Sequence, residues 1–348
     1  MKDYIAPLRL RLDGDALVSN WRWLAAQASE ASCGAAIKAD GYGLGAAQVL
    51  RRLMQAGCRD FFVSNWGEAA VLEPMLEQGV SLSVLHGVRT EDMEQALASH
   101  ARPVLNSPQQ IARWREAGGG LCDVMVDTGM NRLGLDWRDD LPSLTDGLRI
   151  ATCMSHLASA DEDGPFSEIQ RDRFVAVRGH VRSDRYSLAN SAGICLGAHY
   201  AFDLVRPGLA LYGGIPRPAA AGHIRAVAQP QAQLIQCRRV IAGDTIGYNA
   251  THRATCDMEI AILNLGYADG YLRSFSGRGE ASVDGVALPV VGRVSMDLVA
   301  IDVSAHPQVG EGDWIDIAYD LLAASAASGL SQYELLTGLG VRYDRAWM

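Results

Sequence analysis

The sequence predicts an α/β protein, in which an N-terminal (β/α)8 barrel of the TIM type (residues 1–222) precedes a mostly β C-terminal domain (residues 223–348). Over the first two thirds of the chain, short apolar runs alternate with amphipathic helical stretches, the pattern of repeated βα units around a parallel sheet. After about residue 220 the pattern changes to short alternating strands, separated by Gly-Asp and Asp-Gly turns. The segment 216–222, which contains proline and alanine, is the expected linker.

Eight apolar runs predict the strands of the barrel, and this number favours a closed sheet. An open doubly wound sheet is the alternative, but Gly41, Gly43 and Gly45 lack the Gly-x-Gly-x-x-Gly spacing of a dinucleotide-binding loop. The expected strands are 35–39, 61–64, 82–86, 103–105, 122–126, 150–156, 186–189 and 204–205, with helices such as 46–55, 68–77 and 108–117 between them.

The second domain is predicted from short alternating runs and one helical segment. Its expected strands are 231–240, 259–264, 281–283, 298–303 and 314–318, and a helix over 331–339 follows them.

Composition excludes several classes of protein. A net charge of -9 and a pI near 5.4 argue against nucleic-acid and anionic-membrane partners, because no basic surface neutralises a series of phosphates. No window reaches the ~18 consecutive apolar residues of a membrane span. The seven cysteines include no Cys-x-x-Cys pair, which indicates reduced core residues and no metal site. A cytoplasmic location is expected, because residues 1–10 lack the pattern of a signal peptide.

Lys38 is conspicuous because Lys2 is the only other lysine in the chain. Unlike arginine, a lysine loses its proton when it is desolvated, and its neutral amine forms a Schiff base with an aldehyde. The alternative interpretation is a lysine at a strand end that extends to solvent. If the protein carries out amine chemistry, Lys38 is the residue that performs it.

Other polar residues also follow predicted barrel strands, where barrel enzymes place their active sites. Each has an ordinary structural explanation, such as a hydrogen-bonded histidine or a helix cap. Their shared position at the carboxyl ends of the strands nevertheless predicts one functional rim. It consists of Lys38, Arg132, His156, Asn190, Ser191, Arg206 and Gly208.

Several motifs along the whole chain together resemble the alanine racemases, pyridoxal 5'-phosphate enzymes with a barrel and a β domain. The segment that contains Lys38 is similar to the family segment whose lysine binds the cofactor covalently. The matching segments are 36–43, 127–134, 155–161, 189–191 and 206–213 in the barrel, and 246–250, 265–270 and 292–297 in the second domain.

The resemblance implies a two-base interconversion of L- and D-alanine. Lys38 is the acid/base on one face of the cofactor, and Tyr248 from the partner subunit of a homodimer is the base on the other. His156 is implied to link Tyr248 to Arg206, which faces the pyridine nitrogen. An arginine there cannot protonate the ring, because the pKa of its guanidinium is too high.

The resemblance also implies further contacts with cofactor and substrate. The cofactor-binding set includes Asn190, and the substrate carboxylate meets Arg132 and the backbone at Met296. Tyr267, Tyr343 and Asp297 line the entrance, although a turn-capping role for Asp297 is equally compatible with the sequence. The implied phosphate contacts are the hydroxyls of Tyr42, Ser191 and Tyr343 and the backbone N–H groups of Gly208 and Leu209.

One position departs from the family pattern. Many members have a carbamylated lysine seven residues before the motif arginine, and its carboxylate-like end holds that arginine. Here the position is Met125. We therefore expect activity that does not depend on carbon dioxide, with Arg132 oriented by an acidic side chain, by Asn131 or by a bound anion.

Three alternatives to a dedicated alanine racemase stay open. A racemase that also accepts serine is one, because a pocket for a methyl group rejects a hydroxymethyl group only weakly. A pyridoxal-phosphate decarboxylase usually has an acidic residue where Arg206 stands. A non-enzymatic cofactor carrier would not need the second domain with Tyr248. A role in D-alanine biosynthesis is expected, with D-alanine breakdown as the alternative.

Overall fold

The computed structural model describes residues 4–348, so that Lys2 lies outside the described residues. The chain forms two compact units. One is the contiguous segment Ala16–Arg225. The other combines Ala226–Met348 with the described residues up to Asp15. We call them the barrel unit and the β unit.

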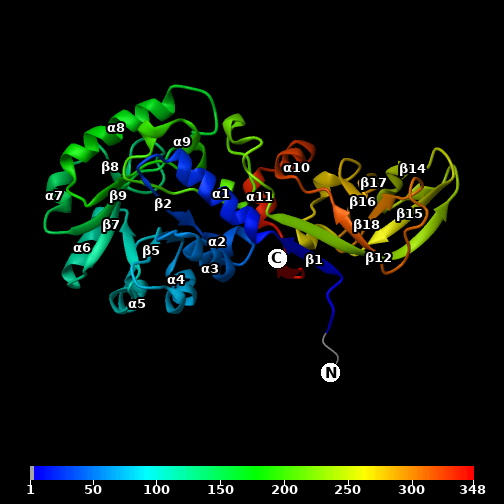
Figure 1. Ribbon diagram of the computed structural model, residues 1–348, viewed down its shortest axis with the longest axis horizontal. Coiled ribbons are helices and arrows are strands. Elements are labelled where there is room, and N and C mark those ends of the chain that lie inside the picture. The colour runs from blue at the N-terminus through cyan, green and yellow to red at the C-terminus, as the bar shows by residue number, and fades with distance from the viewer. Residues whose placement is uncertain (1–3) are drawn as a thin grey trace. The chain divides into compact units, whose positions relative to one another are not determined.

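Parallel strands form the centre of the barrel unit, and helices lie outside them (Figure 1). The prediction of a (β/α)8 barrel with a separate, mostly β domain is confirmed. The strand order is β10-β9-β7-β6-β5-β4-β3, and β11 pairs with β2. The strands are β2 (Ser32–Cys33), β3 (Ala35–Ala36), β4 (Asp60–Val63), β5 (Ser81–Val84), β6 (Arg102–Leu105), β7 (Leu121–Asp127), β9 (Arg149–Met154), β10 (Arg185–Ser187) and β11 (Leu204–Val205), while β8 (Leu135–Asp136) pairs beside β7.

Backbone hydrogen bonds around β11 close this sheet. On one side, the N–H groups of Gly34 and Ala36 donate to the carbonyls of Val205 and Pro207, both at 2.9 Å. On the other side, the Arg206 N–H donates to the Ala189 carbonyl at 2.9 Å. The first and last barrel strands are therefore neighbours, and all carboxyl ends meet at one rim.

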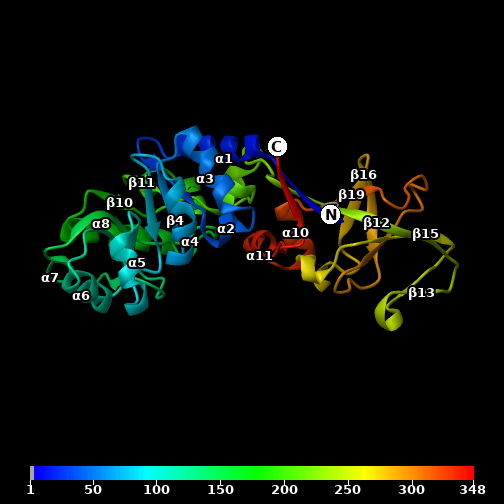
Figure 2. The ribbon, with the colours of Figure 1, turned by 90° about the horizontal axis from the view of Figure 1, so that it is seen from below.

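The helices of the barrel unit begin at side chains that suit helix starts. The Asn65 side chain accepts from the Glu68 N–H at α4, and Ser107 with Pro108 begins α6. Helices α3 and α4 contact each other (Figure 2). The helices are α1 (Gly14–Gln27), α2 (Lys38–Tyr42), α3 (Ala46–Ala56), α4 (Trp66–Leu72), α5 (Met93–Ala98), α6 (Pro108–Glu116), α7 (Leu141–Thr145), α8 (Phe166–His180) and α9 (Ser191–Cys195).

Charged side chains occupy part of the barrel interior. Both oxygens of Asp60 accept hydrogen bonds from the Arg185 guanidinium, at 3.0 and 2.5 Å. Asp123 is completely buried, and its Oδ2 accepts from Ser83 Oγ at 2.6 Å and from Arg102 Nε at 3.4 Å. Burial raises the pKa of Asp123 above its ordinary value despite these partners.

The β unit contains a closed antiparallel barrel. Its strands pair in the cycle β12-β15-β18-β17-β16-β19 and back to β12. Strands β12, β15, β16 and β19 of this barrel are visible in Figure 2. Their bounds are β12 (Ala228–Val240), β15 (Met258–Leu263), β16 (Glu280–Val283), β17 (Val286–Val291), β18 (Val299–Asp302) and β19 (Trp314–Ile317). The unit also contains a ribbon of β13 (Thr245–Ile246) and β14 (His252–Arg253), the helices α10 (Leu321–Ser328) and α11 (Gln332–Thr337), and the strands β1 (Leu8–Leu12) and β20 (Asp344–Trp347).

The N-terminal segment corrects the expectation that residues 1–222 form the barrel domain. β1 (Leu8–Leu12) belongs to the β unit, where it pairs antiparallel with β12 and parallel with β20 (Asp344–Trp347). Its leucines are buried and alternate with arginines, which is the pattern of a strand with one buried face. No helix among residues 4–348 has the length and apolar character needed to cross a membrane.

Candidate active site

Lys38 lies at the carboxyl end of β3, in an unusual turn. The four residues after it are left-handed, with φ of 53° at Ala39, 51° at Asp40, 63° at Gly41 and 56° at Tyr42. The expected strand through Ala39 is therefore wrong, since β3 ends at Ala36. A left-handed conformation costs non-glycine residues roughly 1–2 kcal/mol each, so that surrounding contacts must impose this turn.

Two carboxylates supply such contacts. Asp40 Oδ1 accepts the N–H of Ala46 at 2.8 Å, which joins the turn to the start of α3. Glu68 accepts the Ala39 N–H on Oε1 at 2.9 Å and the Ser64 N–H on Oε2 at 2.7 Å. Glu68 thus joins the Lys38 turn to the end of β4.

The surroundings of Lys38 favour its neutral amine. Burial lowers the pKa of Lys38, the positive charge of Arg132 lowers it further, and the carboxylate of Glu68 partly opposes them. The net pKa is below the ordinary value of a lysine. A larger fraction of Lys38 is therefore available as a nucleophile and base near neutral pH.

His156 follows β9 and is uncharged at neutral pH. Burial, and then the positive charges of Arg206, Arg132 and Lys38, lower the pKa of His156 to about 3. Its carbonyl accepts from Gln170 Nε2 at 3.0 Å, which fixes its backbone. Four residues of the predicted rim, His156, Arg206, Arg132 and Lys38, therefore lie close enough for the three cations to affect the histidine.

Arg206 follows β11 and is buried. Its Nη2 donates to the Ser155 carbonyl at 2.5 Å, and its Nη1 donates to Ser187 Oγ. Burial lowers the pKa of Arg206 to about 10, while the negative charge of Asp123 opposes the shift. Arg206 thus remains a cation at neutral pH, held by a neutral carbonyl and a hydroxyl.

Tyr42, Ser191 and Gly208 form a close-packed cradle at the rim. Ser191 Oγ accepts the N–H of Gly208 at 2.9 Å and of Ala210 at 3.2 Å. A Cβ on Gly208 would lie 2.2 Å from the Tyr42 hydroxyl, and the Tyr42 ring stacks on Tyr212 with centroids 4.6 Å apart. The Gly208 N–H, expected to face a phosphate, is here donated to Ser191.

Two further rim residues have backbone or capping positions. Asn190 Oδ1 accepts the Gly193 N–H at 2.9 Å and so caps α9, the structural role considered for it above. Leu209 begins a 3-10 turn, Leu209–Tyr212, directly after Gly208.

The loop that carries Arg132 is organised by Asp127. Asp127 Oδ1 accepts the Gly129 N–H at 2.7 Å, and Oδ2 accepts the Arg132 N–H at 3.0 Å. Asn131 donates to the Gly129 carbonyl at 3.3 Å and is left-handed, with φ of 57°. Asp127 therefore fixes the Arg132 backbone, while the Met125 side chain is buried and apolar.

The β unit holds the remaining predicted residues. Tyr248 is 67% exposed and begins a turn, Tyr248–Ala250. The Met296 carbonyl accepts the Ala268 N–H at 3.0 Å, and the Tyr267 N–H donates to Ser295, so that these two loops are joined.

The last two predicted residues of the β unit are Tyr343, which lies in the C-terminal segment, and Asp297, which contacts that segment. Tyr343 is buried. Asp297 Oδ1 accepts from Arg342 Nη1 at 2.8 Å, so that its carboxylate is bound to a side chain that sequence reasoning missed, as it also missed Glu68.

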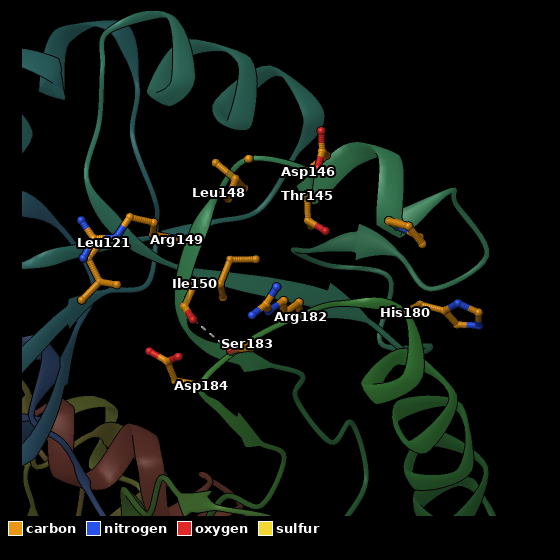
Figure 3. A pocket seen from close by; sticks show the side chains of 12 residues that line it. Leu121, Thr145, Asp146, Leu148, Arg149, Ile150, His180, Arg182, Ser183 and Asp184 are labelled. Atoms are coloured by element: carbon orange, nitrogen blue, oxygen red, sulfur yellow. Dashed lines mark hydrogen bonds between the residues drawn. The ribbon is translucent and has the colours of Figure 1, made fainter.

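A cavity of about 670 Å³ lies at the other end of the barrel unit (Figure 3). It is formed by the amino ends of β7 and β9 and the segment before β10, whereas Lys38, His156 and Arg206 follow carboxyl ends. Residues 4–348 contain no group of three or more His, Cys, Asp or Glu side chains placed to hold a metal ion.

The chain matches two domain families over almost its whole length. The alanine racemase N-terminal domain matches residues 12–216, and the alanine racemase C-terminal domain matches residues 227–347. The chain belongs to the alanine racemase family. The family prediction made from the sequence motifs is thereby confirmed.

Named alanine racemases share this length and fold. The alanine racemase of Acidiphilium cryptum is 43% identical, with 97% of each chain covered, and that of Methylobacterium nodulans is 43% identical over 98% of this chain and 96% of its own. A crystal structure of alanine racemase from Bartonella henselae with covalently bound pyridoxal phosphate has a TM-score of 0.92 at 33% identity, covering 99% of this chain and 100% of that one.

Proposed function

We propose that this alanine racemase family member interconverts L- and D-alanine, with pyridoxal 5'-phosphate bound to Lys38. The observation that carries the proposal is Lys38 itself, a lysine of lowered pKa fixed in a strained turn at the carboxyl end of a barrel strand. We also propose a cytoplasmic homodimer in which residues 223–348 of one subunit complete the active site of the other.

The residues at the rim suit pyridoxal phosphate. Lys38 provides an amine for its aldehyde, and Arg206 a buried cation for its ring nitrogen. Gly208 allows a backbone approach that a Cβ would block, next to the Tyr42 hydroxyl. The Ser191 oxygen accepts two N–H bonds, which leaves its own O–H free to donate to a phosphate.

When bound, pyridoxal phosphate withdraws electrons from the α-carbon of an amino acid and so makes its proton removable. Racemisation then needs one proton acceptor on each face. Lys38 holds the proton at Nζ on one side, and we propose that Tyr248 of the partner subunit holds it at Oη on the other. We propose Asn190 and Tyr343 as further cofactor-binding residues beside this pair.

Positive charge at the rim supports the proposal of Tyr248 as the second base. A phenol with a pKa near 10 is a poor base at neutral pH unless positive charge stabilises its anion. Because His156 is neutral with a pKa of about 3, the positive charge beside it comes from Arg206 and Arg132. His156 is suited to pass a hydrogen bond from Arg206 to Tyr248.

Arg206 also restrains the reaction. With a pKa of about 10 it keeps its proton at neutral pH and cannot transfer it to the ring nitrogen. The weaker electron withdrawal that follows favours simple proton exchange over transamination. We propose that Arg132 and the backbone at Met296 bind the substrate carboxylate, with Tyr267, Tyr343 and Asp297 at the entrance.

The test is incubation of the purified protein with L-alanine and the cofactor in D2O. We expect D-alanine by chiral chromatography and deuterium at Cα, without release of carbon dioxide. Serine and lysine as substrates define the range. Lys38→Ala should lose both the covalent cofactor and activity, and Tyr248→Phe should lose racemisation while the cofactor stays bound. Racemisation that survives Tyr248→Phe would contradict the two-base proposal.

Met125 makes a separate prediction about carbon dioxide. Since Lys38 is the only lysine among the described residues, no other side chain there can form a stable carbamate to hold Arg132. Activity should be equal in buffers equilibrated with carbon dioxide and in degassed buffers. A carbon-dioxide-dependent rate would show that another group fills this role.

A further inference from the structure

One guanidinium in the β unit binds two carboxylates, those of Asp269 and Asp297. Arg342 Nε and Nη2 donate to the two oxygens of Asp269, at 2.6 and 2.9 Å. Its Nη1 donates to Asp297 Oδ1 at 2.8 Å. Because a planar guanidinium binds a carboxylate with two parallel bonds, this contact fixes orientation as well as distance.

Asp269 is a costly group to leave without a partner. It is completely buried, and its Oδ2 also accepts the Gly266 N–H at 2.9 Å. A buried carboxylate that loses its cationic partner is strongly destabilising. The Arg342 side chain is 44% exposed, so that it reaches the buried carboxylate from the surface of the unit.

The three segments that Arg342 joins each carry a residue expected to face the substrate. Tyr343 is the next residue in the chain, Tyr267 lies two residues before Asp269, and Met296 directly precedes Asp297. Arg342 lies in one of these three segments and contacts the other two, which are distant in the sequence, through Asp269 and Asp297.

The backbones of these segments are also in close contact. A Cβ on Gly266 would lie 2.2 Å from the Met296 carbonyl oxygen, and one on Gly270 would lie 2.3 Å from that of Gly338. The Gly340 N–H donates to the Asp269 carbonyl at 3.2 Å. Such packing leaves little room for one segment to move without the others.

We propose that Arg342 is a positioning residue that sets the spacing of Tyr267, Met296 and Tyr343, and with it the size of side chain that the active site admits. This inference rests on the proposed racemisation of alanine. Asp297 acts as the outer partner of Arg342, with its carboxylate turned toward the guanidinium.

The test compares three full-length variants, each loaded with cofactor. Arg342→Met removes all three donors, and Arg342→Lys keeps the charge but not the two parallel bonds. Arg239→Met is the matched control, because Arg239 forms a single exposed contact with Asp257 in the same unit.

We expect Arg342→Met to raise KM for alanine about tenfold, with a smaller change in kcat, and to lower the preference for alanine over serine. Arg342→Lys should be intermediate, and Arg239→Met should resemble the parent.

A double variant separates positioning from stability. Arg342→Met with Asp269→Asn removes the buried charge together with its partner, so that thermal stability should largely return while the lost preference for alanine does not. A purely structural role predicts that stability and preference return together, and that outcome would overturn the proposal.

The parent protein provides the remaining control. A parent that does not racemise alanine refutes the proposed function. A parent that racemises alanine, while Arg342→Met keeps its preference for alanine, refutes only the role of Arg342.

Discussion

Asp60→Asn should destabilise the barrel unit much more than an ordinary loss of one charge. Arg185 donates to both oxygens of Asp60, and Ser81 Oγ donates to Oδ1 at 2.8 Å. The Asp60 side chain is 9% exposed and that of Arg185 is 28% exposed. Asparagine has nearly the same size, so that the substitution removes the charge and one acceptor without leaving a cavity.

The expected loss in the free energy of unfolding follows from the Arg185 charge that the substitution leaves without its partner. Removing one partner of a buried ion pair costs about 3–5 kcal/mol, because the other charge stays buried and unpaired. Partial exposure of Arg185 lowers this to about 2–4 kcal/mol, since water solvates part of the guanidinium. For a unit of this size, about 2–4 °C per kcal/mol gives a fall in Tm of roughly 4–16 °C.

The loss of stability in Asp60→Asn should also depend on pH. Burial by itself raises the pKa of Asp60, but hydrogen bonds and charge from Arg185 outweigh it and hold the pKa below its ordinary value. A lowered pKa gives stability that is complete above the unfolded value of about 3.9 and is lost as pH falls through the folded value. The difference between parent and variant should therefore be full at neutral pH and shrink below about pH 4.

The assay is thermal and urea unfolding, followed by circular dichroism at pH 7 and in acid. Asp136→Asn is the control, because Asp136 also pairs with an arginine, Arg138, but with side chains 38% and 69% exposed. Screening by solvent should keep its effect below about 1 kcal/mol. Equal effects of Asp60→Asn and Asp136→Asn at pH 7 would refute the argument from burial.

Two further predictions concern the active site. Gly208→Ala should weaken cofactor binding about tenfold in a fluorescence titration, because its Cβ would displace the Tyr42 hydroxyl; Gly179→Ala, which meets no neighbouring atom, should not. Glu68→Gln should lower the pKa of Lys38 further, since a negative charge that raises it is lost. Acylation of the cofactor-free protein by acetic anhydride, measured against pH, should then shift to lower pH; a shift to higher pH would contradict the electrostatics.

The barrel strands were predictable because buried parallel strands appear as short continuous apolar runs. The strand expected over 61–64 corresponds to β4, and the one over 122–126 lies within β7. The turn after Lys38 was not predictable. Its left-handed residues include alanine and aspartate, and the contact from Glu68 that holds it comes from the next βα unit.

In the β unit, sequence patterns gave an incomplete set of elements. β17 and β20 were missed, because β17 is partly exposed and β20 lies in a charged, aromatic tail. β1 was also missed; its leucines and arginines alternate, but its partners are more than 200 residues away.

The candidate site was likewise predictable only in part. The positions of Lys38, His156 and Arg206 after predicted strands were enough to expect them on one rim, but the neutral state of His156 depends on its burial and on the positions of three cations. The bond between Arg342 and Asp269 spans 73 residues and has no local sequence signal.

The position of β1 makes the barrel unit an insertion within a β-hairpin. Leu12 at the end of β1 is paired with Ala228 at the start of β12, and the Asp13 N–H donates to the Val227 carbonyl at 2.9 Å. The two strands are antiparallel neighbours that a short turn can connect. A chain in which such a turn replaces residues 14–226 should therefore fold as an independent β unit. Residues 226–348 alone would leave the β1-facing edges of β12 and β20 open to aggregation.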